Sequence, residues 1–328
     1  MGPFPVGVRT IEFRDTSRPK DDGSPRILLT EVWYPASEAA RGQPGVSYDM
    51  RPMLTPEQQA KIAELKIPLL ETPAVRDAPA RTDRGPYPLV VFSHGQGGIR
   101  WQSTFYTVLL ASHGYVVVSP DHEGNTIADA LADRLTPPTE GVGNRPGDVS
   151  ILLTLISRLK AEHPLANMVD MERVGVTGHS FGGLTSLRVA ALDKRVKVIV
   201  PQTPPSTELS WIGISPVQLD IPVMIQASRL DRTLPWTEHI DPSWGDFKRP
   251  RYLMELVTGG HFTFSDLCGF NLEEIAKKVD IDVGDVLSDG CGPTAPPAAQ
   301  AQRMINHFAV GLFNSVLRHS PGSAAPLT

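Results

Sequence analysis

One stretch of the chain has the residue types and spacing of a serine nucleophile held on a tight turn. Gly178, Ser180 and Gly182 form a Gly-x-Ser-x-Gly pattern at the end of an apolar, β-branched run, and a helix-compatible run follows directly. Between a strand and a helix, the two glycines leave room for the backbone to approach, and the serine side chain projects from a strained turn. Ser180 is therefore the candidate nucleophile. An ordinary glycine-rich turn is the alternative interpretation.

A serine hydroxyl needs a general base, and the base needs an acid that orients it. After turns of this kind the acid and then the histidine follow along the chain. Asp231 comes directly after an expected strand at 221–227, and His261 follows an expected strand at 252–257. Both should lie at the carboxyl edge of the sheet, where Ser180 also lies. We interpret Asp231 as the acid and His261 as the base.

Other residues near these positions could fill the same roles. Glu238 is the nearest alternative acid, and Asp231 itself could be a solvated aspartate paired with a neighbouring arginine. His261 could be an ordinary turn histidine. Asp220 precedes its strand and therefore lies at the wrong edge of the sheet. His179 adjoins the serine, but adjacent residues on a tight turn project apart, so we interpret it as a packing or pocket residue.

A glycine-rich turn after the expected strand at 88–93 could supply half of an oxyanion hole. It has the sequence Ser-His-Gly-Gln-Gly-Gly at 93–98. One backbone N–H from such a turn and the N–H of the residue after the nucleophile bind the oxyanion in acyl transfer. We assign these donors to Gln96 and Phe181. The turn lacks the lysine and Ser/Thr of a P-loop, and it lacks Gly-x-Gly-x-x-Gly, which argues against phosphate or dinucleotide binding.

Together these motifs resemble the α/β-hydrolase family, most closely the platelet-activating-factor acetylhydrolase and dienelactone-hydrolase-like branch of bacterial serine esterases. The segments that carry the resemblance are EVWYPA at 31–36, VVFSHGQGG at 90–98, SHGYVVVSPDHEG at 112–124, GHSFGG at 178–183 and GGHFTFSD at 259–266. The resemblance covers roughly residues 2–318 and is weakest at 40–85 and 205–250. Dienelactone hydrolases proper use a cysteine where this chain has Ser180, so dienelactone is not the expected substrate.

The resemblance and the residues together predict a serine carboxylic-ester hydrolase. It would form an acyl-enzyme on Ser180 and act on short to medium acyl esters. The resemblance also allows polyester, phospholipid acetyl, amide or carbamate bonds as substrates of the same triad. A non-catalytic binding protein on the same fold is a distant alternative, which predicts a missing triad residue.

The order of elements predicts an α/β fold, with a mostly parallel eight-stranded sheet and helices on both faces. Strands are expected at 7–14, 26–34, 88–93, 114–119, 172–177, 197–201, 221–227 and 252–257. Apolar stripes at helical spacing predict helices at 145–161 and 301–318. We expect a single domain over 1–319 and a disordered tail at 320–328.

Three insertions interrupt this scheme, at 40–85, 203–220 and 232–250. The first contains a short helix opened by Thr55, with Gln58 three residues later, which is the signature of a capping box. The second and third should overhang the serine. The expected walls of an acyl or alcohol pocket are Trp211, Ile212, Trp236 and Phe262. Ordinary loop packing is the alternative for each of them.

Composition places the chain among globular proteins with a full core. It has 328 residues, of which 41% are hydrophobic, and a formal net charge of −5. The charge and the lack of a basic cluster argue against nucleic acid as a partner. No apolar run is long enough to span a membrane, and no signal-peptide pattern opens the chain. We expect no metal and no cofactor, because the histidines show no ligand spacing, and a monomer or small homo-oligomer.

The two cysteines, Cys268 and Cys291, both lie in the segment after the candidate base. A bridge would close a loop of about 23 residues and contribute roughly 3 kcal/mol in the chain-entropy model. We favour a disulfide over two reduced thiols, because both cysteines fall in one short segment. A disulfide would favour a secreted or periplasmic protein from which a leader was removed, and reduced thiols a cytoplasmic one.

Overall fold

The structure is a computed structural model that describes residues 1–281, 288–291, 298–320 and 322–323, without the side chains of residues 211 and 212. The strands are β1 (Val6–Asp15), β2 (Arg26–Pro35), β3 (Ser47–Tyr48), β4 (Leu70–Glu71), β5 (Val75–Arg76), β6 (Tyr87–Ser93), β7 (Val116–Pro120), β8 (Val169–His179), β9 (Val196–Gln202), β10 (Val223–Ser228) and β11 (Arg251–Leu256). The α-helices are α1 (Pro56–Lys61), α2 (Thr104–Ser112), α3 (Ile127–Leu131), α4 (Pro138–Ser157), α5 (Phe181–Leu192), α6 (Trp236–His239), α7 (Asp241–Trp244), α8 (Leu272–Lys278) and α9 (Ala298–Leu317). Short 3₁₀ helices are η1 (Glu38–Ala40), η2 (Arg51–Met53), η3 (Ser206–Ile212), η4 (Pro216–Gln218), η5 (His261–Phe264) and η6 (Leu267–Phe270).

Within the described residues, nine strands form the main sheet, in the order β11-β10-β9-β8-β6-β7-β2-β1-β5. Neighbours from β11 to β7 are parallel, whereas β2 is antiparallel to β7 and β1. All eight expected strands are present, but the sheet has nine strands, one more than expected. The ninth strand, β5, is a two-residue strand beside β1. Two residues are too few to show the alternation by which a strand is recognised in a sequence.

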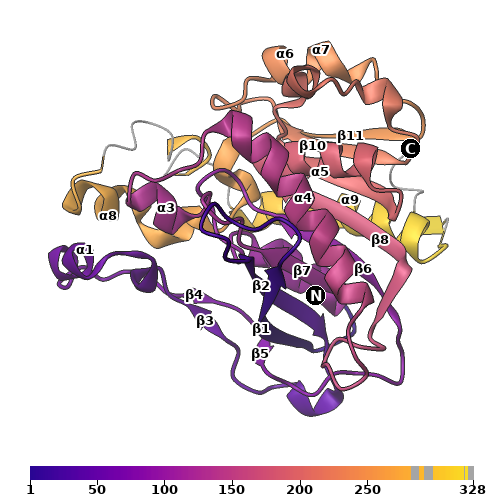
Figure 1. The fold of residues 1–328 in the computed structure, drawn as a ribbon, viewed down its shortest axis with the longest axis horizontal. Helices are drawn as coiled ribbons and strands as arrows, with labels where there is room; N and C mark the ends of the chain where they lie inside the picture. The colour runs from indigo at the N-terminus through magenta and orange to yellow at the C-terminus, as the bar shows by residue number, and fades with distance from the viewer. Residues whose placement is uncertain (282–287, 292–297, 321, 324–328) are drawn as a thin grey trace.

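Helices cover both faces of this sheet, and the side chains along each strand alternate between two cores. On β6, Leu89 and Val91 belong to the core that includes residues of α4 and α5. Val90 and Phe92 belong to the other core, which includes residues of α2 and α9. In Figure 1, α4 and α5 cross in front of the sheet and α9 lies behind it. Burial on both faces explains why the parallel strands are nearly continuous apolar runs.

The parallel strands bring four loops to one edge of the sheet. β6, β8, β10 and β11 end at Ser93, His179, Ser228 and Leu256, and each is followed by a segment that carries a candidate site residue. The register keeps these ends level, because Ser93 pairs with Gly178 and Ser228 pairs with Leu256. The carboxyl edge is therefore the place where the candidate residues meet.

The first insertion is fixed to the sheet by a buried carboxylate. Glu31 of β2 accepts a hydrogen bond from the Tyr48 hydroxyl and another from Arg76 Nη1, each at 2.9 Å. The Tyr48 ring also stacks on Trp101, with ring centroids 5.1 Å apart. These contacts hold Tyr48, which precedes α1, and Arg76, which follows it, against the body of the protein.

Helix boundaries follow the local signals in one case and depart from them in another. The capping box that opens α1 is confirmed: Thr55 Oγ1 accepts from Gln58 N at 3.3 Å, and Gln58 Oε1 accepts from Thr55 N at 3.0 Å. α4 begins at Pro138 rather than near residue 145, so Pro146 lies inside the helix. A proline predicts the first turn of a helix, and Pro138 already occupies that position.

The expected tail at 320–328 lies mostly outside the described residues, which leave out 321 and 324–328. The part that is described continues from α9. Ser320 N donates to the carbonyl of Asn314 at 3.1 Å, which folds the chain back against the end of that helix.

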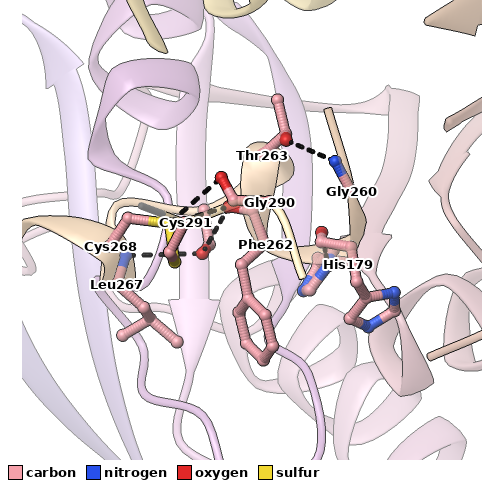
Figure 2. The surroundings of a disulfide bond; sticks show 10 residues. His179, Gly260, Phe262, Thr263, Leu267, Cys268, Gly290 and Cys291 are labelled. Carbon is pink, nitrogen blue, oxygen red and sulfur yellow. Dashed lines mark hydrogen bonds between the residues drawn. A yellow bond between two sulfur atoms is a disulfide. The ribbon is translucent and has the colours of Figure 1, made fainter. Parts of the chain in front are cut away.

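The disulfide between Cys268 and Cys291 is present. It tethers a segment that joins two loops of the carboxyl edge (Figure 2). In that segment, the carbonyl of Asp289 accepts from Phe262 N, and its carboxylate accepts from Thr233 N, both at 2.8 Å. Phe262 lies in the loop after β11 and Thr233 in the loop after β10, so one short segment holds both loops.

Replacing both cysteines with serine should destabilise the protein without unfolding it. The lost cross-link corresponds to about 3 kcal/mol, which for a chain of this length lowers the melting temperature by about 4 °C. Thermal unfolding followed by circular dichroism measures the change. A reductant should lower the melting temperature of the wild type and leave the Cys268→Ser/Cys291→Ser variant unchanged; equal melting temperatures for the two proteins would contradict the prediction.

Candidate active site

Ser180 lies at the junction of β8 and α5 in a backbone conformation that side chains rarely adopt. Its φ is 57° and its ψ is −120°, and strain of this kind costs about 1–3 kcal/mol. The surroundings enforce it. An added Cβ at Gly182 would lie 1.8 Å from the carbonyl oxygen of Ser93, and one at Gly178 would lie 2.4 Å from the same atom. The turn therefore packs directly against the end of β6.

The peptide after Ser180 presents its N–H outward. The Ser180 carbonyl accepts from Gly183 N at 2.8 Å and from Leu184 N at 3.2 Å. Because the C=O and N–H of a trans peptide point in opposite directions, the N–H of Phe181 points away from the helix. The first N–H groups of a helix have no partner within the helix, and they favour an anion. Phe181 N–H is thus placed as a donor beside the serine.

The loop after β6 forms a tight turn with Gln96 near its apex. Gly98 N donates to the Gly95 carbonyl at 3.1 Å, and Gly97 has a φ of 61°, as the third position of a type II turn requires. The turn lies beside Ser180, because an added Cβ at Gly95 would be 3.6 Å from Ser180 Cβ.

The candidate acid and base are in direct contact. His261 Nδ1 donates to Asp231 Oδ2 at 2.8 Å, and both side chains are buried. The second carboxylate oxygen accepts from Leu234 N at 2.7 Å, which fixes the carboxylate in its loop. This bond puts the proton of a neutral imidazole on Nδ1 and makes Nε2 the acceptor. Asp220, in contrast, pairs with Lys248 near the start of β10.

His179 links the loop after β6, which carries the candidate oxyanion donor Gln96 and is called the oxyanion loop below, to the loop after β11, which carries the candidate base His261 and is called the base loop. Gly95 N donates to Gln102 Oε1 at 3.0 Å, and Gln102 Nε2 donates to His179 Nδ1 at 2.9 Å. The other ring nitrogen of His179 donates to the carbonyl of His261 at 2.9 Å, and the two imidazole centroids are 4.6 Å apart. The sequence predicted a packing or pocket residue here, and the hydrogen bonds add that His179 sets the spacing of two loops.

A second Ser-His-Asp set lies beneath the first. Ser93 Oγ donates to His122 Nε2 at 2.9 Å, and His122 Nδ1 donates to Asp148 Oδ2 at 3.0 Å. Asp148 also pairs with Arg18 at 2.7 Å. The serine, histidine and aspartate are fully buried, so no substrate can reach them. This set ties the end of β6 to the segment after β7 and to α4.

Three histidines in and below the site are buried and neutral. Burial lowers the pKa of His94 and of His179 well below the ordinary value; the charge of Arg145 adds to the effect on His94, and that of His261 adds to the effect on His179. Burial, with Arg145, lowers the pKa of His122 to about 4. Near neutral pH all three rings therefore donate with one nitrogen and accept with the other.

An apolar cavity of about 190 Å³ opens beside the oxyanion loop. Its walls come from the first insertion, the oxyanion loop, α3 and the segment from η5 to residue 281. They are Met50, Leu54, Gln96, Gly97, Ile127, Ala130, Leu131, Phe262, Leu267, Leu272, Ile275, Ala276 and Ile281. In Figure 2 the Phe262 ring extends away from the disulfide and lies between Leu267 and His179.

The expected pocket walls are only partly brought together. Phe262 lines the apolar cavity. Trp236 is buried in the main core with 4% of its surface exposed, and the guanidinium of Arg229 lies 3.9 Å from its ring centroid. It is thus a packing residue, which was the alternative interpretation. The side chains of Trp211 and Ile212 lie outside the described part of the chain. Met50 and Leu54 were missed, because apolar residues in a loop carry no signal of what they face.

Two further features of the described residues bear on the class of site. No group of three or more His, Cys, Asp or Glu side chains in these ranges is placed to hold a metal ion. No helix in them is long and apolar enough to cross a bilayer.

The sheet order, the strained serine turn and the acid and base loops at the carboxyl edge define an α/β-hydrolase. More narrowly, the chain belongs to the PET hydrolase-like family, whose model matches residues 82–279. The model for platelet-activating factor acetylhydrolase, isoform II, matches residues 18–140. The first insertion, up to residue 81, lies before the part that matches the PET hydrolase-like model.

Individual relatives are similar over parts of their length. A platelet-activating factor acetylhydrolase of Canis lupus familiaris is 29% identical over 44% of this chain and 40% of its own. Cutinase est1 of Thermobifida alba is 27% identical over 54% of each chain. The chain thus spans about half the length of the curated relatives it matches. The structure of a ferulic acid esterase from Streptomyces cinnamoneus matches with a TM-score of 0.72 and 25% identity, over 99% of this chain and 93% of that one.

The three buried histidines predict a loss of stability in acid. Their pKa is lowered in the folded state, so the unfolded chain binds more protons below about pH 6.5, and stability falls as the pH drops from there. Each such proton contributes about 1.4 kcal/mol per pH unit. Urea unfolding between pH 4 and 8 measures the slope. His122→Gln should lower the slope of the free energy of unfolding against pH by an amount that corresponds to about one proton. His307→Gln, at an exposed site, should leave this slope unchanged. Equal slopes in the wild type and His122→Gln would contradict the prediction.

Proposed function

We propose that the protein is a serine ester hydrolase in which Ser180 is the nucleophile, His261 the base and Asp231 the acid. The observation that carries the proposal is the 2.8 Å hydrogen bond between His261 and Asp231, made by two loops at the sheet edge where Ser180 holds its positive φ. A buried imidazole oriented by a carboxylate is the partner that a serine hydroxyl needs to act as a nucleophile.

The proposed reaction proceeds through an acyl-enzyme. Ser180 Oγ attacks the ester carbonyl while its proton passes to His261 Nε2, and the oxyanion is held by the N–H groups of Gln96 and Phe181. The protonated imidazole, stabilised by Asp231, then gives the proton to the leaving alcohol. Water attacks the acyl group by the same steps in reverse, and Ser180 regains its proton. The groups that move the proton and hold the oxyanion in these steps are side chains and backbone N–H groups of the protein.

The apolar cavity is the place where the acyl chain of the ester would bind, and its size favours a chain of short to medium length. Its wall includes Gln96, whose N–H would bind the carbonyl oxygen, so the chain attached to that carbonyl is within reach of the cavity. Leu54 and the residues of α3 and α8 bound its volume, which disfavours long lipids. The names of the relatives, which include acetylhydrolase, cutinase and ferulic acid esterase, favour an ester over an amide or carbamate.

The disulfide supports a place in an oxidising compartment. Such bonds persist in secreted and periplasmic proteins and are rare in the cytosol. The bond between Cys268 and Cys291 fixes the segment that holds the acid and base loops together, so an oxidising environment would preserve the geometry of the site.

Removing members of the triad tests the assignment. Ser180→Ala should abolish hydrolysis of p-nitrophenyl butyrate, and Asp231→Asn should lower kcat by about 10⁴-fold, because the imidazole loses its oriented tautomer. Asp241→Asn is the matched control: Asp241 follows α6, accepts from Trp236 Nε1 and is assigned no role in the reaction. Near-normal turnover by Ser180→Ala would end the proposal.

Narrowing the cavity and widening it should shift the preferred acyl chain length in opposite directions. Each buried methylene is worth about 0.8 kcal/mol, so kcat/KM of the wild type should rise from acetate to medium chains and then fall. Leu54→Trp should move the optimum to shorter acyl chains and Leu54→Ala to longer ones. The measurement is kcat/KM for p-nitrophenyl esters from acetate to palmitate.

The exposed Leu69 of the same insertion supplies the control, since Leu69→Trp should leave the acyl profile unchanged. A parallel series that varies the alcohol of butyrate esters separates the two sides of the ester. A shift in that series alone would assign the cavity to the alcohol and contradict the acyl assignment.

A further inference from the structure

Arg145 of α4 is a buried cation without a carboxylate partner. Only 1% of its surface is exposed, and among the described residues it makes no salt bridge. Two of its nitrogens, Nε and Nη1, are buried without a hydrogen-bond partner. Burial lowers its pKa to about 9, so the guanidinium remains charged at neutral pH. A buried, unpaired charge is costly to stability, so its presence calls for a physical reason.

The guanidinium donates to the backbone of the oxyanion loop. Arg145 Nη2 lies 2.6 Å from the carbonyl oxygen of His94 and 3.4 Å from that of Gly95. The imidazole of His94 shares this task. Its Nε2 accepts from His122 N at 3.2 Å, so its Nδ1 carries the proton and donates to the Gly95 carbonyl at 2.7 Å.

These bonds set the direction of the candidate oxyanion donor. The carbonyl of Gly95 and the N–H of Gln96 belong to the same peptide, and in a trans peptide they point in opposite directions. Donors that hold the Gly95 oxygen in the interior therefore turn Gln96 N–H outward, toward the edge where Ser180 lies. A peptide whose carbonyl is hydrogen-bonded is also polarised, which strengthens its N–H as a donor.

Arg145 also contacts the residue that carries the second donor. Its guanidinium carbon lies 5.0 Å from the centroid of the Phe181 ring, within the range of a cation–π contact. One side chain thus touches both segments from which the oxyanion hole would be built, the turn at 94–97 and the first residue of α5.

We propose that Arg145 is a positioning residue of the oxyanion hole: it holds the carbonyls of His94 and Gly95 in the interior, so that the N–H of Gln96 faces the reacting carbonyl. The fixed positive charge of Arg145 behind this turn also stabilises the negative charge that develops on the ester oxygen in the transition state. The interaction therefore favours the transition state over the bound ester. The proposal rests on the function proposed above.

Arg145→Gln tests this assignment, with active sites counted by titration with a fluorophosphonate so that misfolded protein does not enter kcat. The expected result is a fall in kcat per titrated site of about 10²–10³-fold, the usual effect of losing an oxyanion donor, with KM within a few-fold of wild type. The affinity of a butyl trifluoromethyl ketone, which forms a tetrahedral oxyanion on serine, should fall in parallel. Arg145→Lys, which keeps the charge but not the fork, should recover part of both.

Arg195→Gln is the matched control. Like Arg145, Arg195 donates to a backbone carbonyl, but this is the carbonyl of Ser150 in α4, at 2.8 Å, away from the loop at 94–97. It should lower the melting temperature and leave kcat per titrated site unchanged. Wild-type kcat per titrated site in Arg145→Gln would overturn the inference. If Arg145→Gln does not fold, wild-type values in Arg145→Lys would overturn it equally. Activity in Ser180→Ala would instead refute the proposed function.

Discussion

The close approach of the serine turn to the end of β6 is the constraint on which the rest of the site depends. Glycine at 178 and 182 lets two backbones meet where no Cβ would fit, and this contact forces Ser180 into its positive φ. It also brings the loop that starts at Ser93 beside the nucleophile. The candidate acid and base then need only extend from β10 and β11, which lie beyond β9 in the same sheet and whose ends the parallel register keeps level. The strain at one residue is thus balanced by the packing of the whole central sheet.

Much of the fold and the outline of the site could be predicted because their signals are local. Apolar runs marked the central strands, and Gly-x-Ser-x-Gly after such a run marked the elbow at Ser180. Asp231 and His261 followed from chain order and strand ends, and the structure puts them in contact. Arg145 could not be predicted in the same way, since an arginine on a helix is usually solvated and its partners here are carbonyls fifty residues earlier in the chain.

The polar groups near Ser180 form two layers, and a residue's type predicts its role in only one of them. The upper layer, with Asp231 and His261, is made of residues whose types imply reactivity. The lower layer, with His94, His122 and Asp148, has the same residue types, but its serine, Ser93, is fully buried, whereas Ser180 in the upper layer is partly exposed. Its neutral imidazoles pass hydrogen bonds between elements without adding charge beneath the site. Residue type alone therefore cannot separate chemistry from support; only exposure and the partner of each nitrogen distinguish the two layers.

The attachment of the first insertion through Glu31 has a consequence for redesign of the cavity. The buried carboxylate of Glu31, on β2, holds Tyr48 and Arg76; all three residues precede the part that matches the PET hydrolase-like model and lie within the part that matches the model for platelet-activating factor acetylhydrolase, isoform II. The segment that contributes Met50 and Leu54 to the cavity is therefore held both by β2 and by Trp101 of the loop after β6. A replacement segment that keeps Tyr48 and Arg76 would therefore retain its attachment to the sheet while presenting a different cavity wall.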